Sequence, residues 1–425
     1  MKLVLIAPSW ADPLWKKEKT KGIFPPLNLA IVAGLTPEDW EIRIVDENLE
    51  DVDTSLDADL VGITAMTSLA PRAYQIADAF RARGVKVVLG GIHSTALPEE
   101  AIQHADAVVI GEAEATWPQV VKDFLAGGLQ PFYRAAQYPS LDSLSPARRQ
   151  LLNHERYLLP STVYTTRGCP FACSFCSVTT FFGHTYRFRP VMEVVKEIGT
   201  LPNKLVAFVD DNIIGNLRYA RNLFQALVQQ KITWFSQGSI NIAKHPDLLD
   251  LARESGCIGL FIGFESLSPT TLKEMHKKQN QVEEYEEAIT TIHRHGLSVE
   301  GAFVFGFDED DEAVFERTVD FARRNKMEAA QFAILTPYPG TPLYTEMEQQ
   351  GRIIDDNWAH YDVSHVVFEP RGMSAKTLQE GRNWAWKEFY SLSSIASRLG
   401  LFHRYGPGLW ALNWQIRKRV RNPAI

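Results

Sequence analysis

The chain has 425 residues, 45% of them hydrophobic and 22% charged, and carries a formal net charge of −7. This composition is ordinary for a globular protein of two or three domains, and the charge gives no reason to expect a nucleic acid as the partner. No uninterrupted apolar run reaches the length of about 18 residues that a membrane-spanning helix needs. The short apolar run at the N-terminus is followed by Trp10, Asp12 and the charged residues 16–19, which is not typical of a signal peptide, so we expect a cytoplasmic protein.

The first 130 residues alternate between strand and helix patterns. Short buried apolar runs predict strands at residues 3–7, 41–45, 60–64, 85–89 and 107–110. Helices are predicted between them, at residues 25–34 and 71–83. Buried strands that alternate with helices indicate an α/β domain with a parallel, doubly wound, Rossmann-like sheet. Such a sheet binds its ligands at the carboxyl ends of its strands.

The rest of the chain divides into three parts. Residues 131–160 lack the alternation and carry four prolines, which predicts a linker. Six further strands are predicted at residues 162–166, 204–209, 233–236, 258–263, 299–305 and 330–336. With the helices between them, these strands suit a partial (β/α)6 barrel over residues 161–345. Residues 346–425 form a helical, aromatic C-terminal region in this interpretation.

Three of the four cysteines stand within eight residues. Cys169, Cys173 and Cys176 have the spacing Cys-x3-Cys-x2-Cys directly after a predicted strand. Clustered thiols in a reducing compartment indicate a metal or redox site rather than a disulfide. Thiolates ligate iron–sulfur clusters, and three of them leave one iron free to chelate the amino and carboxylate groups of a small molecule. The alternative is inert thiols or zinc, whose fourth ligand would have to be His184 or Cys257.

The run from Thr165 to Cys176 resembles the radical S-adenosylmethionine (SAM) superfamily, in which Cys-x3-Cys-x-aromatic-Cys follows the first barrel strand. The resemblance implies that the three cysteines bind a [4Fe-4S] cluster and that SAM ligates its free iron. We expect Phe175 to shield the cluster or to lie along the adenine of SAM. Further candidates for SAM binding follow the next strands, namely Asp210, Asp211, Asn212, Ser239, Gly263 and Glu265. Each has an alternative role as a cap of the following helix.

The N-terminal α/β domain, residues 1–130, resembles the cobalamin-binding domain of a large radical SAM class. The residues that match, and that we expect near cobalamin, are Thr64, Met66, Ser68, Gly90, Gly91, Gly111 and Glu112. The Asp-x-His-x-x-Gly signature, whose histidine ligates cobalt, is absent, as it is from many members of this class. His93 is expected to be a turn residue rather than a ligand. A domain that has lost its cofactor is the alternative.

The segment from Gly263 to His365 is similar to the subfamily that contains the hopanoid C-2 methylase. The function this implies is cobalamin-dependent methyl transfer to an unactivated carbon of a lipid or secondary metabolite, with an electron donor such as flavodoxin or ferredoxin. The alternatives are another radical reaction (ring closure, carbon–carbon coupling or aminocarboxypropyl transfer) and a non-catalytic cobalamin or tetrapyrrole sensor. No catalytic residue is assigned. The aromatic and basic tail, residues 410–421, is either a peripheral membrane anchor or a packed helix with a solvated end.

Overall fold

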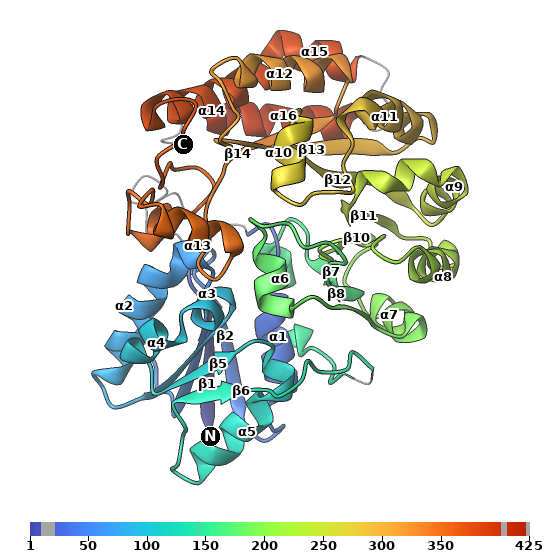
Figure 1. Cartoon of the computed structure of the whole chain (residues 1–425). Coiled ribbons are helices and arrows are strands. Elements are labelled where there is room, and N and C mark those ends of the chain that lie inside the picture. The colour runs from blue at the N-terminus through green and yellow to red at the C-terminus, as the bar shows by residue number, and fades with distance from the viewer. Residues whose placement is uncertain (10–21, 143, 401–405, 422–425) are drawn as a thin grey trace.

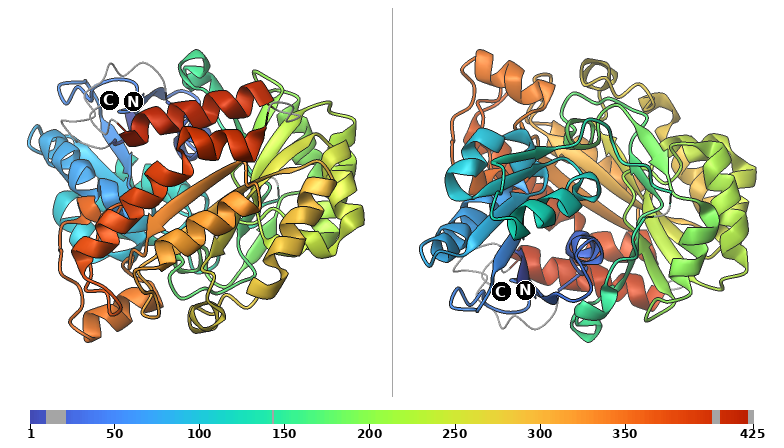
Figure 2. Two further views of the ribbon diagram at one scale, coloured as in Figure 1. Left: turned by 90° about the horizontal axis from the view of Figure 1, so that it is seen from above. Right: turned by 90° about the horizontal axis from the view of Figure 1, so that it is seen from below.

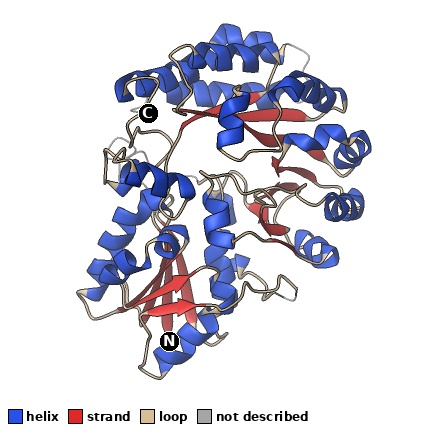
Figure 3. Ribbon diagram, in the orientation of Figure 1, coloured by secondary structure: helices blue, strands red, loops and turns tan. Residues whose placement is uncertain are grey.

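The structure is a computed structural model that describes residues 1–9, 22–142, 144–400 and 406–421. Trp10, Asp12 and the charged residues 16–19 lie outside the described residues. The described residues form two six-stranded sheets and one two-stranded sheet. Figure 1 and Figure 3 show the two large sheets as separate sets of strands, with the helices of residues 375–399 and 406–421 packed beyond the second one.

The first sheet is doubly wound. Its order is β2-β1-β3-β4-β5-β6 and every pair in it is parallel. The strands are β1 (Lys2–Ala7), β2 (Glu41–Asp46), β3 (Leu60–Thr64), β4 (Lys86–Gly90), β5 (Ala107–Ile110) and β6 (Phe132–Arg134). The helices are α1 (Leu27–Gly34), α2 (Ala70–Arg81), α3 (Ile92–Ala96), α4 (Pro98–Ala101) and α5 (Trp117–Leu125). The strand order reverses between β1 and β3, and a sheet of this kind opens a ligand crevice at that point. The predicted architecture is confirmed.

One strand of this sheet was not predicted. Phe132–Arg134 lies in the segment expected to be a linker, yet it pairs with β5 as the edge strand. Pro131 precedes it and accepts a hydrogen bond from the Val108 N–H at 2.8 Å, which is compatible with proline because only its carbonyl is used. Tyr133 is buried and its hydroxyl donates to Asp123 of α5 at 3.0 Å. Three residues among prolines are too few to show an alternating pattern, which is why the sequence does not predict this strand.

The second sheet is the partial barrel. Its order is β7-β10-β11-β12-β13-β14, again with parallel neighbours throughout. The strands are β7 (Ser161–Val163), β10 (Leu205–Phe208), β11 (Thr233–Gly238), β12 (Cys257–Glu265), β13 (Ser298–Phe305) and β14 (Ala329–Ile334). The helices that follow them in the chain are α7 (Val191–Ile198), α8 (Leu217–Val228), α9 (Pro246–Glu254), α10 (Pro269–Glu274), α11 (Tyr285–Arg294) and α12 (Val314–Arg324). Figure 2 shows these helices along the outside of the curved sheet.

The predicted first barrel strand, residues 162–166, is interrupted. After β7 the chain turns into β8 (Thr166–Gly168), which pairs antiparallel with β9 (Tyr186–Phe188). The turn is held by Asp210, whose Oδ1 accepts hydrogen bonds from the backbone N–H and the hydroxyl of both Thr165 and Thr166. The β8–β9 hairpin therefore leaves the barrel wall and carries the cysteine loop together with α6 (Ser177–Phe182).

The C-terminal region is helical as predicted. It contains α13 (Pro342–Gln349), α14 (Ala375–Phe389), α15 (Leu392–Leu399) and α16 (Gly406–Arg421). Trp386 of α14 donates to the Phe332 carbonyl of β14 at 2.7 Å, so this helix covers the last strand. Asn413 of α16 is fully buried and donates to the Glu328 carbonyl at 3.0 Å, which packs the tail on the barrel. Over the described ranges, no helix combines the length and the apolar character needed to cross a bilayer.

Candidate functional site between the two sheets

The cysteine loop begins directly after β8. Cys169, Cys173 and Cys176 are partly buried and none of them forms a disulfide. Burial raises the pKa of all three thiols, and that of Cys176 reaches about 12. Thiols of this kind become good ligands only when a metal displaces their protons. Gly168 has a φ of +83° and a Cβ there would collide with the Thr185 carbonyl, so glycine allows the hairpin to close just before the loop.

Two predicted SAM-binding residues lie beside the loop. The amide nitrogen of Asn212 is 4.0 Å from the Cys169 sulfur and 3.5 Å from the Ser239 hydroxyl. The side-chain oxygen of Asn212, Oδ1, accepts from the Ser239 backbone N–H at 3.2 Å, which fixes the Asn212 side chain relative to Ser239. Across the loop, the Gln279 amide nitrogen is 3.9 Å from the Cys173 sulfur. The ends of β10 and β11 therefore present polar groups next to the thiols, as the barrel layout predicts.

Asp210 and Asp211 have different surroundings although they are adjacent. Asp210 is buried and its Oδ1 is committed to Thr165 and Thr166, so it holds the hairpin and does not line the cleft described below. Asp211 does line that cleft, and its Oδ2 accepts from the Gly168 N–H at 3.2 Å. Burial, with a smaller effect of the Asp210 charge, raises the pKa of Asp211 to about 7.

The remaining predicted SAM residues lie around the end of β12 and within the loop. Glu265 ends β12 and is ion-paired with Lys277. Gly263 lies directly beneath this pair, because a Cβ on Gly263 would be 2.9 Å from the Lys277 Nζ. Phe175 packs edge-on against Phe307, with their ring centroids 6.5 Å apart. Its ring therefore faces the end of β13 and forms part of the wall beside the cysteines.

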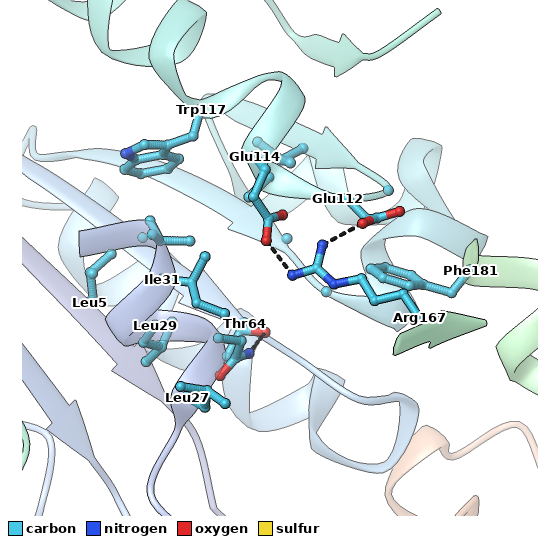
Figure 4. Close-up of a pocket in the computed structure, with 18 of the residues that line it drawn as sticks. Leu5, Leu27, Leu29, Ile31, Thr64, Glu112, Glu114, Trp117, Arg167 and Phe181 are labelled. Atoms are coloured by element: carbon cyan, nitrogen blue, oxygen red, sulfur yellow. Dashed lines mark hydrogen bonds and ion pairs between the residues drawn. The ribbon is translucent and has the colours of Figure 1, made fainter. Parts of the chain in front are cut away.

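A cleft separates the first sheet from the cysteine hairpin. Figure 4 shows its apolar part between α1 and the first sheet and its charged part beside Arg167. From the predicted cobalamin residues, Thr64, Gly90, Gly91, Gly111 and Glu112 line it. Met66 and Ser68 do not line the cleft. Met66 is 58% exposed, and Ser68 is buried in the short helix Thr67–Leu69. The opposite wall comes from the hairpin, α6 and the ends of β7 and β10, and it consists of Tyr164, Thr166, Arg167, Phe181, Phe182, Val209 and Asp211.

A charged network joins the two walls. The Arg167 guanidinium of β8 is paired with Glu112 and Glu114, which follow β5 (Figure 4). Arg187 of β9 is also paired with Glu112. The sequence gives no role to Arg167 or Arg187. Their closeness to the cysteine motif is the one feature of the sequence that could have pointed to them. Contacts between two sheets leave no spacing pattern in the chain.

No histidine occurs among the described residues that line the cleft. His93 is fully buried in α3, where its Nε2 is 3.1 Å from the Tyr74 hydroxyl and 3.2 Å from Glu100. It was predicted to be a turn residue. The turn is instead made by Gly91, whose φ is +96°, and His93 already belongs to the helix that follows.

These residues fit the cofactors that the resemblance implies. Within the described parts of the chain, no three His, Cys, Asp or Glu side chains converge on a point that suits a single metal ion. Cys257 is the first residue of β12, which has nine residues. At the usual rise per residue of a strand, Cys257 lies about 26 Å from the last residue of β12, so it cannot complete a zinc site with the cysteine loop. Three thiols without a fourth ligand fit a polynuclear cluster instead. A Cβ on Gly111 would meet nothing within 4 Å, so the cleft has open space where a large ring system would lie.

Comparisons with known proteins agree with this geometry. Residues 163–322 match the family model of the radical SAM superfamily, and residues 17–121 match that of the B12 binding domain. Bacteriochlorophyllide d C-12(1)-methyltransferase of Chlorobaculum tepidum is 34% identical over 88% of this chain and 84% of that protein. Hopanoid C-2 methylase of Rhodopseudomonas palustris is 29% identical over 81% of this chain and 68% of that protein.

A solved structure shares the whole architecture. TsrM of Kitasatospora setae, a radical SAM methyltransferase whose structure has cobalamin and a [4Fe-4S] cluster bound, superposes with a TM-score of 0.71 over 100% of this chain and 99% of that chain, at 15% identity. At this identity the likeness shows the fold. The 34% identical relative, matched over most of both chains, shows the family. The chain therefore belongs to the cobalamin-dependent radical SAM methyltransferases, enzymes that use a [4Fe-4S] cluster, SAM and cobalamin.

Proposed function

We propose that this enzyme methylates an unactivated carbon of a large apolar molecule in the cleft between its two sheets. The observation that carries the proposal is that strand ends of both sheets line one cleft. Thr64, Gly90 and Gly91 come from the first sheet, and Arg167 and Asp211 come from the hairpin and the second sheet. When bound, the cluster supplies the electron that splits SAM, and cobalamin supplies the methyl group.

On the barrel side, we propose that Cys169, Cys173 and Cys176 hold the cluster. Asn212 and Ser239, fixed to each other beside Cys169, are placed to hydrogen-bond the amino-acid part of SAM. Four further residues complete the proposed SAM site, namely Phe175, Asp211, Gly263 and Glu265. Asp210 contributes indirectly, because it holds the hairpin that carries the cysteines.

On the side of the first sheet, we propose that Thr64, Gly90, Gly91, Gly111 and Glu112 contact cobalamin. Thr64 accepts a hydrogen bond from Asn28 at 3.1 Å, which orients its hydroxyl at the mouth of the crevice. Below it the cleft continues between the sheet and α1 as an apolar trench lined by Leu5, Ile31, Val88, Val109 and Trp117. A flat aromatic group fits such a trench, and the apolar walls keep water away from the reacting carbon. Met66 and Ser68 are not part of this proposed set.

The substrate class follows from the relatives. Two of them are methyltransferases of bacteriochlorophyllide d, and another is the hopanoid C-2 methylase. We propose an extended apolar ring system of this kind, a tetrapyrrole or a polycyclic lipid, as the substrate. A flavodoxin or ferredoxin is the proposed electron donor. An apolar substrate also suits weak membrane contact through α16, where Trp414 is 45% exposed and lies under the Lys418 ammonium.

The test is an anaerobic reaction of the reconstituted protein with SAM that carries a deuterated methyl group. Bacteriochlorophyllide d and a hopanoid serve as probe substrates, each with and without added cobalamin. We expect a labelled methyl group in the product, S-adenosylhomocysteine, and 5′-deoxyadenosine, all dependent on cobalamin. Formation of 5′-deoxyadenosine with an unlabelled, rearranged product would favour ring closure or coupling. Cobalamin binding without any cleavage of SAM would favour a sensor.

A further inference from the structure

The loop after α10, residues 275–280, lies against the cysteine loop. The Ser174 N–H donates to the Met275 carbonyl at 3.2 Å, and the Ser174 hydroxyl is 3.3 Å from the Met275 sulfur. Gln279 is in turn 3.9 Å from the Cys173 sulfur. Two residues of this short loop therefore reach the segment that holds the thiols, and Lys277 lies between them in the chain.

Lys277 is a buried cation. Its side chain is 11% exposed and is ion-paired with Glu265, whose side chain is 12% exposed. Its ion pair with the Glu265 carboxylate keeps the ammonium protonated although it is buried, and its charge lies near Cys173 and Cys176. The same proximity acts on the thiol, because Lys277 partly offsets the rise that burial causes in the pKa of Cys173.

The backbone around this pair is held in an uncommon conformation. Glu265 has a φ of +64° and stands at a β-bulge where the register between β12 and β13 shifts. His276, next to Lys277, has a φ of +56°. Left-handed conformations of non-glycine residues cost free energy and persist where the surroundings impose them. Asn280 helps to impose the conformation at Glu265, because its side-chain amide donates to the carbonyls of Gly263 at 2.9 Å and Phe264 at 3.1 Å.

We propose that Lys277 is a positioning residue that raises the reduction potential of the cluster, by holding a buried ammonium beside Cys173, and that Glu265 is the counter-charge that limits this effect. The inference rests on the proposed cluster site. A cluster with three thiolate ligands becomes more negative when it takes up an electron, and a fixed cation in a poorly solvated site stabilises the reduced form. Because the two charges have opposite signs, removing one or the other must move the potential in opposite directions.

The experiment is a potentiometric titration of the reconstituted full-length protein without SAM, followed by electron paramagnetic resonance of the reduced cluster. We expect Lys277→Met to make reduction about 10-fold less favourable, a fall of about 59 mV for one electron. Glu265→Gln is expected to raise the potential by a comparable amount. Lys278→Met is the matched control, because Lys278 is the next residue and is exposed, and it is expected to leave the potential unchanged.

Opposite shifts with unchanged iron content support the proposal, since loss of packing would not change sign between the two variants. If the Lys277→Met protein fails to hold a cluster, the Glu265→Gln protein still tests the proposal. An unchanged or lowered reduction potential in Glu265→Gln overturns it. Unchanged potentials together with weaker SAM binding in Lys277→Met would also overturn it and assign the ammonium to the SAM carboxylate. Wild-type protein that takes up no cluster would instead overturn the proposed function itself, and iron analysis of the wild type detects this first.

Discussion

Arg167, which stands two residues before Cys169, is ion-paired with Glu112 at the end of β5 in the other sheet. The side chains are 10% and 2% exposed, and Glu112 also pairs with Arg187 from the same hairpin. The hairpin that carries the cysteine loop is thus tied to the sheet that carries the glycine-rich strand ends. This network fixes how the proposed cluster and cobalamin sites face each other across the cleft.

Replacing Arg167 should destabilise the protein strongly. Arg167→Met leaves Glu114 without its partner and Glu112 with only one, and breaking a buried ion pair costs about 3–5 kcal/mol. The measurement is the shift of the urea unfolding midpoint under anaerobic conditions. Arg221→Met is the matched control, since its pair with Asp247 is largely exposed and is expected to contribute less than about 1 kcal/mol. Equal shifts in the two variants would show that the network does not join the sheets.

The cysteine motif and the Arg167 network differ in how far the sequence could predict them. The three cysteines are separated by three and two residues, so a chemical pattern is visible in the chain itself. Arg167 and Glu112 are 55 positions apart and belong to different sheets, and nothing local in either segment indicates the other. The positions of most strands and the partial barrel were predictable because buried apolar runs report on strands one at a time. Contacts between sheets depend on how the finished layers pack.

Asp210 shows the same limit inside one strand end. Its place after a buried strand predicts a ligand-binding carboxylate, as it does for Asp211. The hydrogen bonds from Thr165 and Thr166 turn Asp210 away from the cleft, while Asp211 faces it. Neighbouring residues of an extended segment point in opposite directions, and the sequence does not tell which of them lines the cleft.

The cluster cysteines should be individually essential. Cys169→Ala, Cys173→Ala and Cys176→Ala are each expected to abolish the reducible cluster and the cleavage of SAM, because a cluster with two protein ligands is not held. Iron and sulfide analysis with electron paramagnetic resonance checks this. Cys257→Ala is the control, because Cys257 is buried at the far end of β12 and should keep full iron content. Iron loss in that control would contradict the assignment of three ligands.

Filling the cleft at Gly90 should block cobalamin without unfolding the protein. A Cβ on Gly90 would have no atom closer than 3.7 Å, so the backbone tolerates a side chain, and a larger one projects into the cleft. We expect Gly90→Leu to weaken the binding of hydroxocobalamin at least about 10-fold, or roughly 1.4 kcal/mol, followed by absorbance after gel filtration. Gly128→Leu is the control, because Gly128 also has open space but lies away from the cleft. Unchanged binding in Gly90→Leu would place cobalamin elsewhere.

The bound cobalt should lack a histidine ligand from the protein. The described residues that line the cleft include no histidine, and His93 is buried against Tyr74 and Glu100. The electron paramagnetic resonance spectrum of the cob(II)alamin form is therefore expected to show no nitrogen hyperfine splitting from a protein axial ligand. Protein labelled with 15N separates the two sources of nitrogen, because a splitting from a protein histidine would change with the label. Such a change would contradict the proposed geometry.

Glu265 should contribute to SAM binding as well as to the charge beside the cluster. It ends β12 at the barrel face where the cysteine loop lies, and the bulge at Gly263 turns its carboxylate toward Lys277. Charge-assisted hydrogen bonds contribute about 1.5–3 kcal/mol, so Glu265→Gln is expected to weaken SAM binding about 10-fold or more while the cluster stays intact. Calorimetry on the anaerobic protein measures the affinity, and Glu274→Gln, an exposed carboxylate at the end of α10, is the control. If Glu265→Gln binds SAM as tightly as this control, the Glu265 carboxylate does not contact SAM and serves only as the partner of Lys277.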